Sequence, residues 1–144
     1  MIVVFGSINL DLIFPLASIP RAGETLMTRS VTISPGGKGA NQAVAAALDG
    51  ARVVMAGAVG RDSLAAGALD LLRAAGVDLS RVAEVADAAT GCAAIAVDAA
   101  GNNAIAVGLG ANLLARAGQV EDALPAPAPR WCCRWRSIPS RPPR

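Results

Sequence analysis

The sequence has no histidine, and aromatic residues make up only 3% of its 144 residues. Without histidine, no imidazole can serve as a catalytic base in this chain. Apolar residues nevertheless reach 53%, with alanine the most conspicuous among them. The core must therefore be built mainly from Val, Leu, Ile and Ala, which suits helices layered on a sheet. The length fits one ordinary domain.

Cysteine and long apolar runs are scarce as well. Cys92, Cys132 and Cys133 are odd in number and two are adjacent, which fits neither a disulfide framework nor a paired C-x-x-C metal site. We therefore expect a reducing compartment. No uninterrupted apolar run approaches the roughly 18 residues of a membrane span, and residues 2–5 form an apolar segment with no basic leader before it. These absences predict a cytoplasmic protein with no membrane segment.

Basic charge is concentrated at the end of the chain. Residues 1–129 contain eight basic and eleven acidic residues, whereas residues 130–144 contain five Arg and no acid. The net charge of +2 therefore comes from the tail. Nucleic-acid binding needs basic residues organised on a folded face, and this tail offers only Arg among Pro, Trp and Cys. We expect no nucleic-acid partner.

The most distinctive stretch is a glycine-rich turn before an alanine-rich helix, Ser34-Pro35-Gly36-Gly37-Lys38-Gly39-Ala40-Asn41-Gln42-Ala43. Its glycines allow close approach of a ligand, and the helix N-terminus offers N–H groups and a positive dipole end at the same spot. Thr32 and Gly39 break the nucleotide P-loop pattern, and Gln42 breaks the dinucleotide fingerprint. The pattern predicts a polar-ligand site, and a plain strand-to-helix turn is the alternative.

The remaining chain alternates strands and helices. We expect strands at 2–6, 11–17, 25–33 and 52–58, and helices at 39–48, 63–75 and 113–124. Two short strands at 91–98 and 103–108 flank a Gly-Asn turn and predict a hairpin. This order indicates a parallel sheet covered by helices, in which Asn9 and Asp11 follow the first strand, where open α/β sheets bind ligands.

Seven motifs occur together in the order and spacing of one family. They are Gly6-Ser7-Ile8-Asn9-Leu10-Asp11, Gly23-Glu24-Thr25, Gly36 to Ala43, Val59-Gly60-Arg61-Asp62, Gly76-Val77-Asp78, Thr90-Gly91 and Gly110-Ala111-Asn112. Over residues 1–124 the chain resembles the pfkB-type carbohydrate kinases, and among them the ribokinases. The resemblance implies the N-terminal half of a ribokinase-like fold, a Rossmann-like α/β sandwich with a small β-sheet lid. The lid strands would lie at about 11–33 and 91–108.

The resemblance also implies an activity and a binding site. The family transfers the γ-phosphoryl group of ATP to a sugar hydroxyl, with Mg²⁺ and often a monovalent cation such as K⁺. Ribose is the implied substrate, and a homodimer through the lid the implied assembly. The family's sugar contacts fall on Asn9, Leu10, Asp11, Gly37, Lys38, Gly39, Ala40 and Asn41. A carboxylate and an amide suit this task, because together they can bind neighbouring hydroxyls.

One family motif has no counterpart in this sequence. The catalytic aspartate and the anion-binding glycine loop lie in a D-T-x-G-A-G-D motif, which is absent here. We therefore expect no catalytic, cofactor-binding or metal-binding residue in this chain, and no activity of the chain alone. A smaller departure is Asn102, where ribokinases commonly carry Glu. Two functional alternatives remain open: a kinase for another furanose sugar or a nucleoside, and a non-catalytic sugar-binding or dimerising fragment.

The tail is the least regular part of the sequence. Past Pro125 the charge balance changes, every periodic pattern ends, and Cys132-Cys133 stands between two Trp. We predict that residues 125–144 are a non-native or disordered Pro/Arg-rich tail, and that the chain is translated out of frame from about Pro125 or Arg130.

Overall fold

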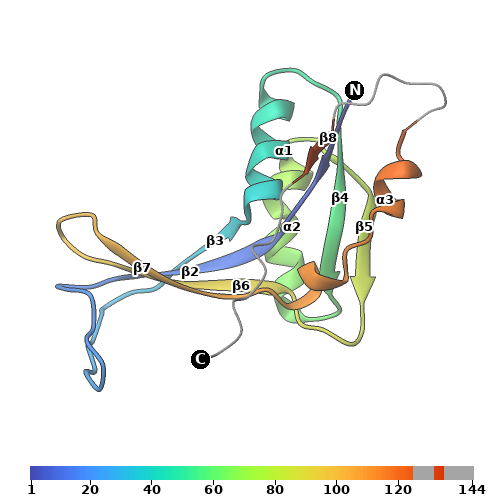
Figure 1. The fold of residues 1–144 in the computed structure, drawn as a ribbon. Helices are drawn as coiled ribbons and strands as arrows, with labels where there is room; N and C mark the ends of the chain where they lie inside the picture. The colour runs from blue at the N-terminus through green and yellow to red at the C-terminus, as the bar shows by residue number, and fades with distance from the viewer. Residues whose placement is uncertain (125–131, 135–144) are drawn as a thin grey trace.

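The computed structural model describes residues 1–124 and 132–134 of the chain. It contains two four-stranded sheets (Figure 1). The main sheet has the order β5-β4-β1-β8 and is parallel throughout, with β1 at Ile2–Phe5, β4 at Val53–Gly60, β5 at Asp78–Val85 and β8 at Cys132–Arg134. The lid sheet has the order β3-β2-β6-β7, with β2 at Asn9–Pro15, β3 at Thr32–Gly36, β6 at Gly91–Val97 and β7 at Asn103–Gly108. Figure 1 shows the lid sheet extending away from the main sheet as a narrow blade.

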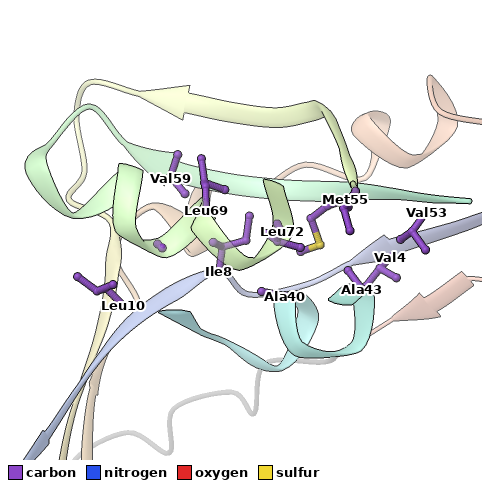
Figure 2. Packing of buried hydrophobic residues seen from close by; sticks show 12 residues of the cluster. Val4, Ile8, Leu10, Ala40, Ala43, Val53, Met55, Val59, Leu69 and Leu72 are labelled. Carbon is purple, nitrogen blue, oxygen red and sulfur yellow. The ribbon is translucent and has the colours of Figure 1, made fainter. Parts of the chain in front are cut away.

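Two helices, α1 at Lys38–Leu48 and α2 at Ser63–Ala74, pack on the main sheet, and the principal core lies between them and its strands (Figure 2). Ile8, Met55 and Leu72 are almost completely buried there. Burying each such side chain contributes about 1.5–3 kcal/mol. A smaller cluster centred on Val3 and Val54 includes residue 120 of α3, Gly118–Glu121, and residues 123 and 124 just after this helix.

Asp62 connects α2 to the lid. Its Oδ1 accepts hydrogen bonds from the backbone N–H groups of Leu64 and Ala65, both at 3.1 Å, and thereby caps the helix. Its Oδ2 accepts from the Thr90 N–H at 2.7 Å, and the Thr90 hydroxyl in turn accepts from the Gly60 N–H at 2.9 Å. The hydrogen bond from the Thr90 backbone is the largest of the effects that hold the pKa of the Asp62 carboxyl below its ordinary value. One carboxylate therefore ties the start of α2 to the end of β4 and the start of β6.

The structure confirms the predicted helices at 39–48 and 63–75 to within one residue, and it confirms the hairpin as β6 and β7. The strand predicted at 25–33 is wrong, because β3 begins only at Thr32 and continues through Pro35 to Gly36. Proline is tolerated there because β3 is an edge strand. Strand β5 was not predicted, since its polar side chains alternate with half-buried ones and leave no continuous apolar run.

The single helix predicted at 113–124 is wrong. A 3₁₀ helix, η1, spans Gly110–Leu114, Ala115 is extended, and α3 is a separate short helix. The predicted tail at 125–144 lies outside the described residues except for β8, where the sequence suggested no strand and the structure has a three-residue strand paired with β1. Within residues 1–124 and 132–134, no helix has the length and apolar character to cross a membrane.

Candidate functional site

The β1–β2 connection and the N-terminus of α1 meet at one point of the fold. The Ser7 hydroxyl accepts a hydrogen bond from the Lys38 backbone N–H at 3.1 Å, and the Ser7 carbonyl accepts from the Ala40 N–H at 3.1 Å. These contacts satisfy two of the N–H groups that a helix leaves unpaired at its start. The helix N-terminus that was predicted to face a ligand is thus partly occupied by Ser7.

The glycines of the turn serve close packing within the chain. Gly37 has a φ of 94°, and a Cβ there would lie 2.5 Å from the Ser7 carbonyl oxygen. A Cβ on Gly39 would lie 2.6 Å from the Gly6 carbonyl carbon. We predicted that these glycines let a ligand come close to the backbone. At positions 37 and 39, the structure shows that α1 itself comes close to the β1–β2 connection. Their contact with a sugar stays a prediction.

Asp11 is the most unusual side chain of the site. It lies in β2 between Ser34 of β3 and Ala93 of β6. Its Oδ1 is buried and accepts no hydrogen bond from the described residues. Gly36 makes room for the carboxylate, because a Cβ on Gly36 would overlap it. Burial raises the pKa of the Asp11 carboxyl above its ordinary value. A buried acceptor without a donor is costly, so this carboxylate is placed as if for an external donor.

Asn9 lies two residues before Asp11 on β2, and side chains two apart in a strand share a face. Asn9 is 8% exposed, and its Oδ1 accepts a hydrogen bond from the Asn112 Nδ2 at 2.9 Å. Its own Nδ2 donates to no atom of the described residues. One face of β2 therefore presents an amide donor and, beside it, a carboxylate acceptor.

Lys38 and Asn41 are both exposed in the first turn of α1. They are three residues apart and therefore lie on one side of the helix. The pairing of Gly36 with Asn9 and the bond from the Lys38 N–H to Ser7 bring this turn beside the start of β2. The structure thus gathers four of the predicted polar groups, Asn9, Asp11, Lys38 and Asn41, around the same junction.

Leu10 and Ala40 are placed differently. Both side chains belong to the principal core, with exposed fractions of 6% and 4%. Leu10 packs toward α2, where its Cδ1 would lie 3.2 Å from a Cβ on Gly67, and the Ala40 N–H is already bonded to Ser7. The sugar contacts of these two residues stay predictions, and the burial of both side chains in the core does not support them.

Sequence reasoning named the Gly110-Ala111-Asn112 motif but assigned Asn112 no role. In the structure, the Asn112 side chain bonds to the backbone of Ile8 through both its oxygen and its nitrogen, and it also holds the Asn9 side chain. The signal available in the sequence was an Asn directly after two small residues at a predicted helix start. It does not reveal a partner more than a hundred positions away.

A donor set for the implied Mg²⁺ is missing from the part of the chain that the structure describes. No three Cys, Asp or Glu side chains come together there in a way that could hold a metal ion. The junction offers one unpaired carboxylate, which suits hydroxyl groups better than a divalent cation, since Mg²⁺ demands a nearly complete octahedron of oxygens. These residues do not fit a metal site, and no step of phosphoryl transfer is assigned to them.

A second feature lies on the opposite face of the lid sheet. An open hollow of about 570 Å³ is lined by apolar side chains of β2, β6 and β7 and by residues of the 16–28 segment. Phe14, three positions from Asp11 on β2, lines this hollow and so lies on the other face. Ile33 is 63% exposed and pairs with Leu12, which shares the face of Phe14.

Comparison with known proteins gives a consistent match. Residues 1–129 match the model of the pfkB family carbohydrate kinases. The chain is 45% identical to the ribokinase of Bacillus subtilis over 111 residues, which is 77% of this chain and 38% of that protein. It is 40% identical to the deoxyribokinase of Salmonella typhi over 111 residues, 77% of this chain and 36% of that protein.

Among solved structures, Arabidopsis thaliana ribokinase complexed with ribose and ATP matches with a TM-score of 0.69 and 33% identity. That match covers 77% of this chain and 36% of the other. The chain therefore spans little more than a third of the length of these relatives.

Proposed function

Because the chain belongs to the pfkB family of carbohydrate kinases, we propose that it carries the sugar-binding part of a ribokinase, which phosphorylates a hydroxyl of ribose with ATP. The observation that carries the proposal is the buried Asp11 Oδ1 without a partner, next to the unused Asn9 Nδ2. A sugar hydroxyl can donate to the first and accept from the second. Supporting the choice of ribose, a similar ribokinase from Arabidopsis thaliana is complexed with ribose and ATP.

The arrangement favours a polyhydroxylated ligand over an ionic one. The carboxylate of Asp11 would repel an anion. A neutral sugar satisfies both the donor and the acceptor without bringing in a charge, and burial strengthens each hydrogen bond because water is excluded. The remaining predicted contacts, Lys38 and Asn41, lie at the exposed rim, where hydroxyls of the same sugar would be within reach of side chains.

The proposal separates binding from catalysis. Phosphoryl transfer depends on a positioned base and on groups that stabilise the developing charge. The family motif that supplies both is absent from this sequence. We therefore expect the purified 144-residue chain to bind ribose and not to phosphorylate it. Isothermal titration with ribose tests the first statement, and an ADP-release assay with ATP and Mg²⁺ tests the second. Absence of ribose binding would overturn the proposed sugar site.

The similarity to a deoxyribokinase favours a second candidate, 2-deoxyribose. The two sugars differ by one hydroxyl, and a site built to bind that hydroxyl loses a buried partner when it is missing. Titration of the same chain with both sugars decides between them. Ribose binding at least tenfold tighter than 2-deoxyribose binding would support the ribokinase, and the reverse order would support the deoxyribokinase.

A homodimer through the lid is the proposed assembly. The open apolar hollow and the exposed Ile33 on the face away from Asp11 support it, because such surface is stabilised when it is covered. Light scattering after gel filtration should give twice the mass of the chain, and Ile33→Lys should reduce it to the mass of a monomer. Leu48→Lys is the matched control, since Leu48 is 76% exposed at the end of α1, away from the lid. A monomeric parent chain would contradict this assembly.

A further inference from the structure

We infer that Asn112 is a positioning residue for sugar binding, because it fixes the orientation of the Asn9 amide so that the Asn9 Nδ2 faces the ligand. The inference rests on the proposed function, in which Asn9 contacts the sugar. Asn112 itself does not contact the sugar. Its role is to orient the Asn9 amide so that the Asn9 Nδ2, and not the Oδ1, can bind the ligand.

The hydrogen bonds of Asn112 leave only one assignment of its own amide. The Ile8 N–H donates to Oδ1 at 2.8 Å, while Nδ2 donates to the Ile8 carbonyl at 3.1 Å and the Leu109 carbonyl at 3.0 Å. A backbone N–H can only donate and a carbonyl can only accept. Exchanging the oxygen and nitrogen of Asn112 would therefore break all three bonds. The side chain is locked by main chain alone.

The fixed orientation of the Asn112 amide also fixes the orientation of the Asn9 amide. The Asn112 Nδ2 also lies 2.9 Å from the Asn9 Oδ1, so its two hydrogens are shared among three acceptors. Because this nitrogen can only donate, Asn9 turns its oxygen and not its nitrogen toward Asn112. The Asn9 Nδ2 is then left to donate to an external oxygen. Asp11, on the same face of β2, can only accept when it is ionised. The two side chains therefore require a ligand oxygen that accepts next to a hydroxyl that donates, which gives the bound sugar a defined direction.

The local structure holds Asn112 at this place by features other than the amide itself. The Ala111 N–H donates to the Ala89 carbonyl at 2.7 Å, and the Ala111 side chain is fully buried. Gly91 of β6 leaves the space in which the two amides meet, since a Cβ there would overlap both the Asn112 Nδ2 and the Asn9 Oδ1. The start of η1 and the start of β6 are thus arranged around this one contact.

Replacing the donor end of Asn112 by an oxygen tests the inference. Asn112→Asp keeps an acceptor for the Ile8 N–H but loses the donor to Asn9, so Asn9 can turn its Nδ2 away from the ligand and toward the new carboxylate. We expect ribose affinity, measured by isothermal titration of the full chain, to fall at least tenfold. A second variant, Asn9→Asp, keeps the bond from Asn112 and puts an oxygen where the donor was. It should lose affinity to a similar degree without disturbing Asn112.

Gln119→Glu is the matched control. The Gln119 Nε2 donates to the carbonyls of Gly57 at 2.7 Å and Arg81 at 2.8 Å, and its Oε1 accepts from the Arg116 N–H. The substitution therefore removes an amide donor from two backbone carbonyls, as Asn112→Asp does, but at a place with no link to Asn9. Ribose affinity of this variant should stay within twofold of the parent. Equal affinities of Asn112→Asp and Gln119→Glu would overturn the inference.

A measurement on the parent chain needs neither a variant nor a ligand. In ¹⁵N-edited NMR spectra, the Asn112 NH₂ should exchange slowly with solvent, whereas the Asn9 NH₂ should exchange quickly and become protected when ribose is added. An Asn9 NH₂ already protected without ribose would show that its orientation is the opposite one. If the parent chain binds no ribose, the proposed function fails, while the exchange rates still decide the orientation of Asn9.

Discussion

Asp11→Ala should make the folded chain more stable and the sugar site weaker. The Asp11 Oδ1 is buried without a donor, and a group of this kind costs about 1–3 kcal/mol. The residue as a whole is only half-buried, so the lower end of this range applies, and we expect the free energy of unfolding to rise by about 1 kcal/mol. Loss of a charged hydrogen bond to the sugar should weaken ribose binding by about 2–3 kcal/mol, on the order of 30- to 150-fold.

The pH dependence of the same variant follows from the raised pKa of the Asp11 carboxyl. An acid with a raised pKa in the folded state favours folding below its unfolded pKa, near 3.9, and this contribution is lost as the pH rises through the folded pKa. Asp11→Ala has no carboxyl at this position and therefore does not lose this contribution to stability as the pH rises. The stability advantage of the variant over the parent should therefore be small near pH 3.5 and full at pH 7.

Urea denaturation at both pH values and ribose titration at pH 7 measure the two effects. Asp87→Ala is the matched control, because Asp87 is an exposed acid and its removal changes the net charge equally. That control should alter neither stability nor affinity appreciably. The reasoning is refuted if Asp11→Ala is less stable than the parent at pH 7, or if it binds ribose equally well.

Three further substitutions test the framework of the site. Asp62→Ala removes the cap of α2 and the hydrogen bond from the Thr90 N–H, and it should lower the free energy of unfolding, measured in urea, by about 2–4 kcal/mol. Because the pKa of the Asp62 carboxyl is lowered in the folded state, the parent should be more stable than this variant above about pH 4, and the difference should vanish as the pH falls through the folded pKa. Gly36→Ala should weaken ribose binding at least tenfold in titration, since its Cβ overlaps the Asp11 carboxylate, and unchanged affinity would contradict this placement. Leu72→Ala, at a position 1% exposed, should cost about 2–5 kcal/mol without a separate effect on affinity in the folded fraction.

The fold and its motifs were largely predictable because they depend on local patterns. The alanine-rich helix α1, the capped helix α2 and the β6–β7 hairpin each carry their own start and stop signals in the sequence. Strand β5 and the broken helix after Gly110 carry weaker ones. Strand β5 is half-buried at the sheet edge, and η1 ends at Leu114 with no glycine or proline directly after it to mark the break.

The polar residues of the site were predictable by type, but their partners were not. Asn9 and Asp11 follow a strand, as ligand-binding residues of open α/β sheets often do. Asn9 is hydrogen-bonded within the chain by Asn112, whereas the Asp11 Oδ1 has no partner and its carboxylate lies against Gly36. Both contacts are tertiary. Spacing along the chain carries no information on such contacts. For the same reason the glycines at 37 and 39 suggested a ligand, whereas the space beside them is filled by residues 6 and 7.

The difference between Asn9, which is hydrogen-bonded within the chain, and Asp11, whose Oδ1 is not, supports the proposed binding site at this junction. A junction selected only for stability would gain from satisfying both side chains or from replacing Asp11 by an apolar residue, since an unpaired buried acceptor lowers stability. Instead, Gly36 and Gly91 lack the side chains that would fill the two spaces. Asn9 is tied down through its oxygen, and the Asp11 oxygen is buried without a partner. The fold thus bears a cost at one carboxylate and fixes the amide beside it, an arrangement that becomes favourable when a hydroxylated ligand supplies the missing donor.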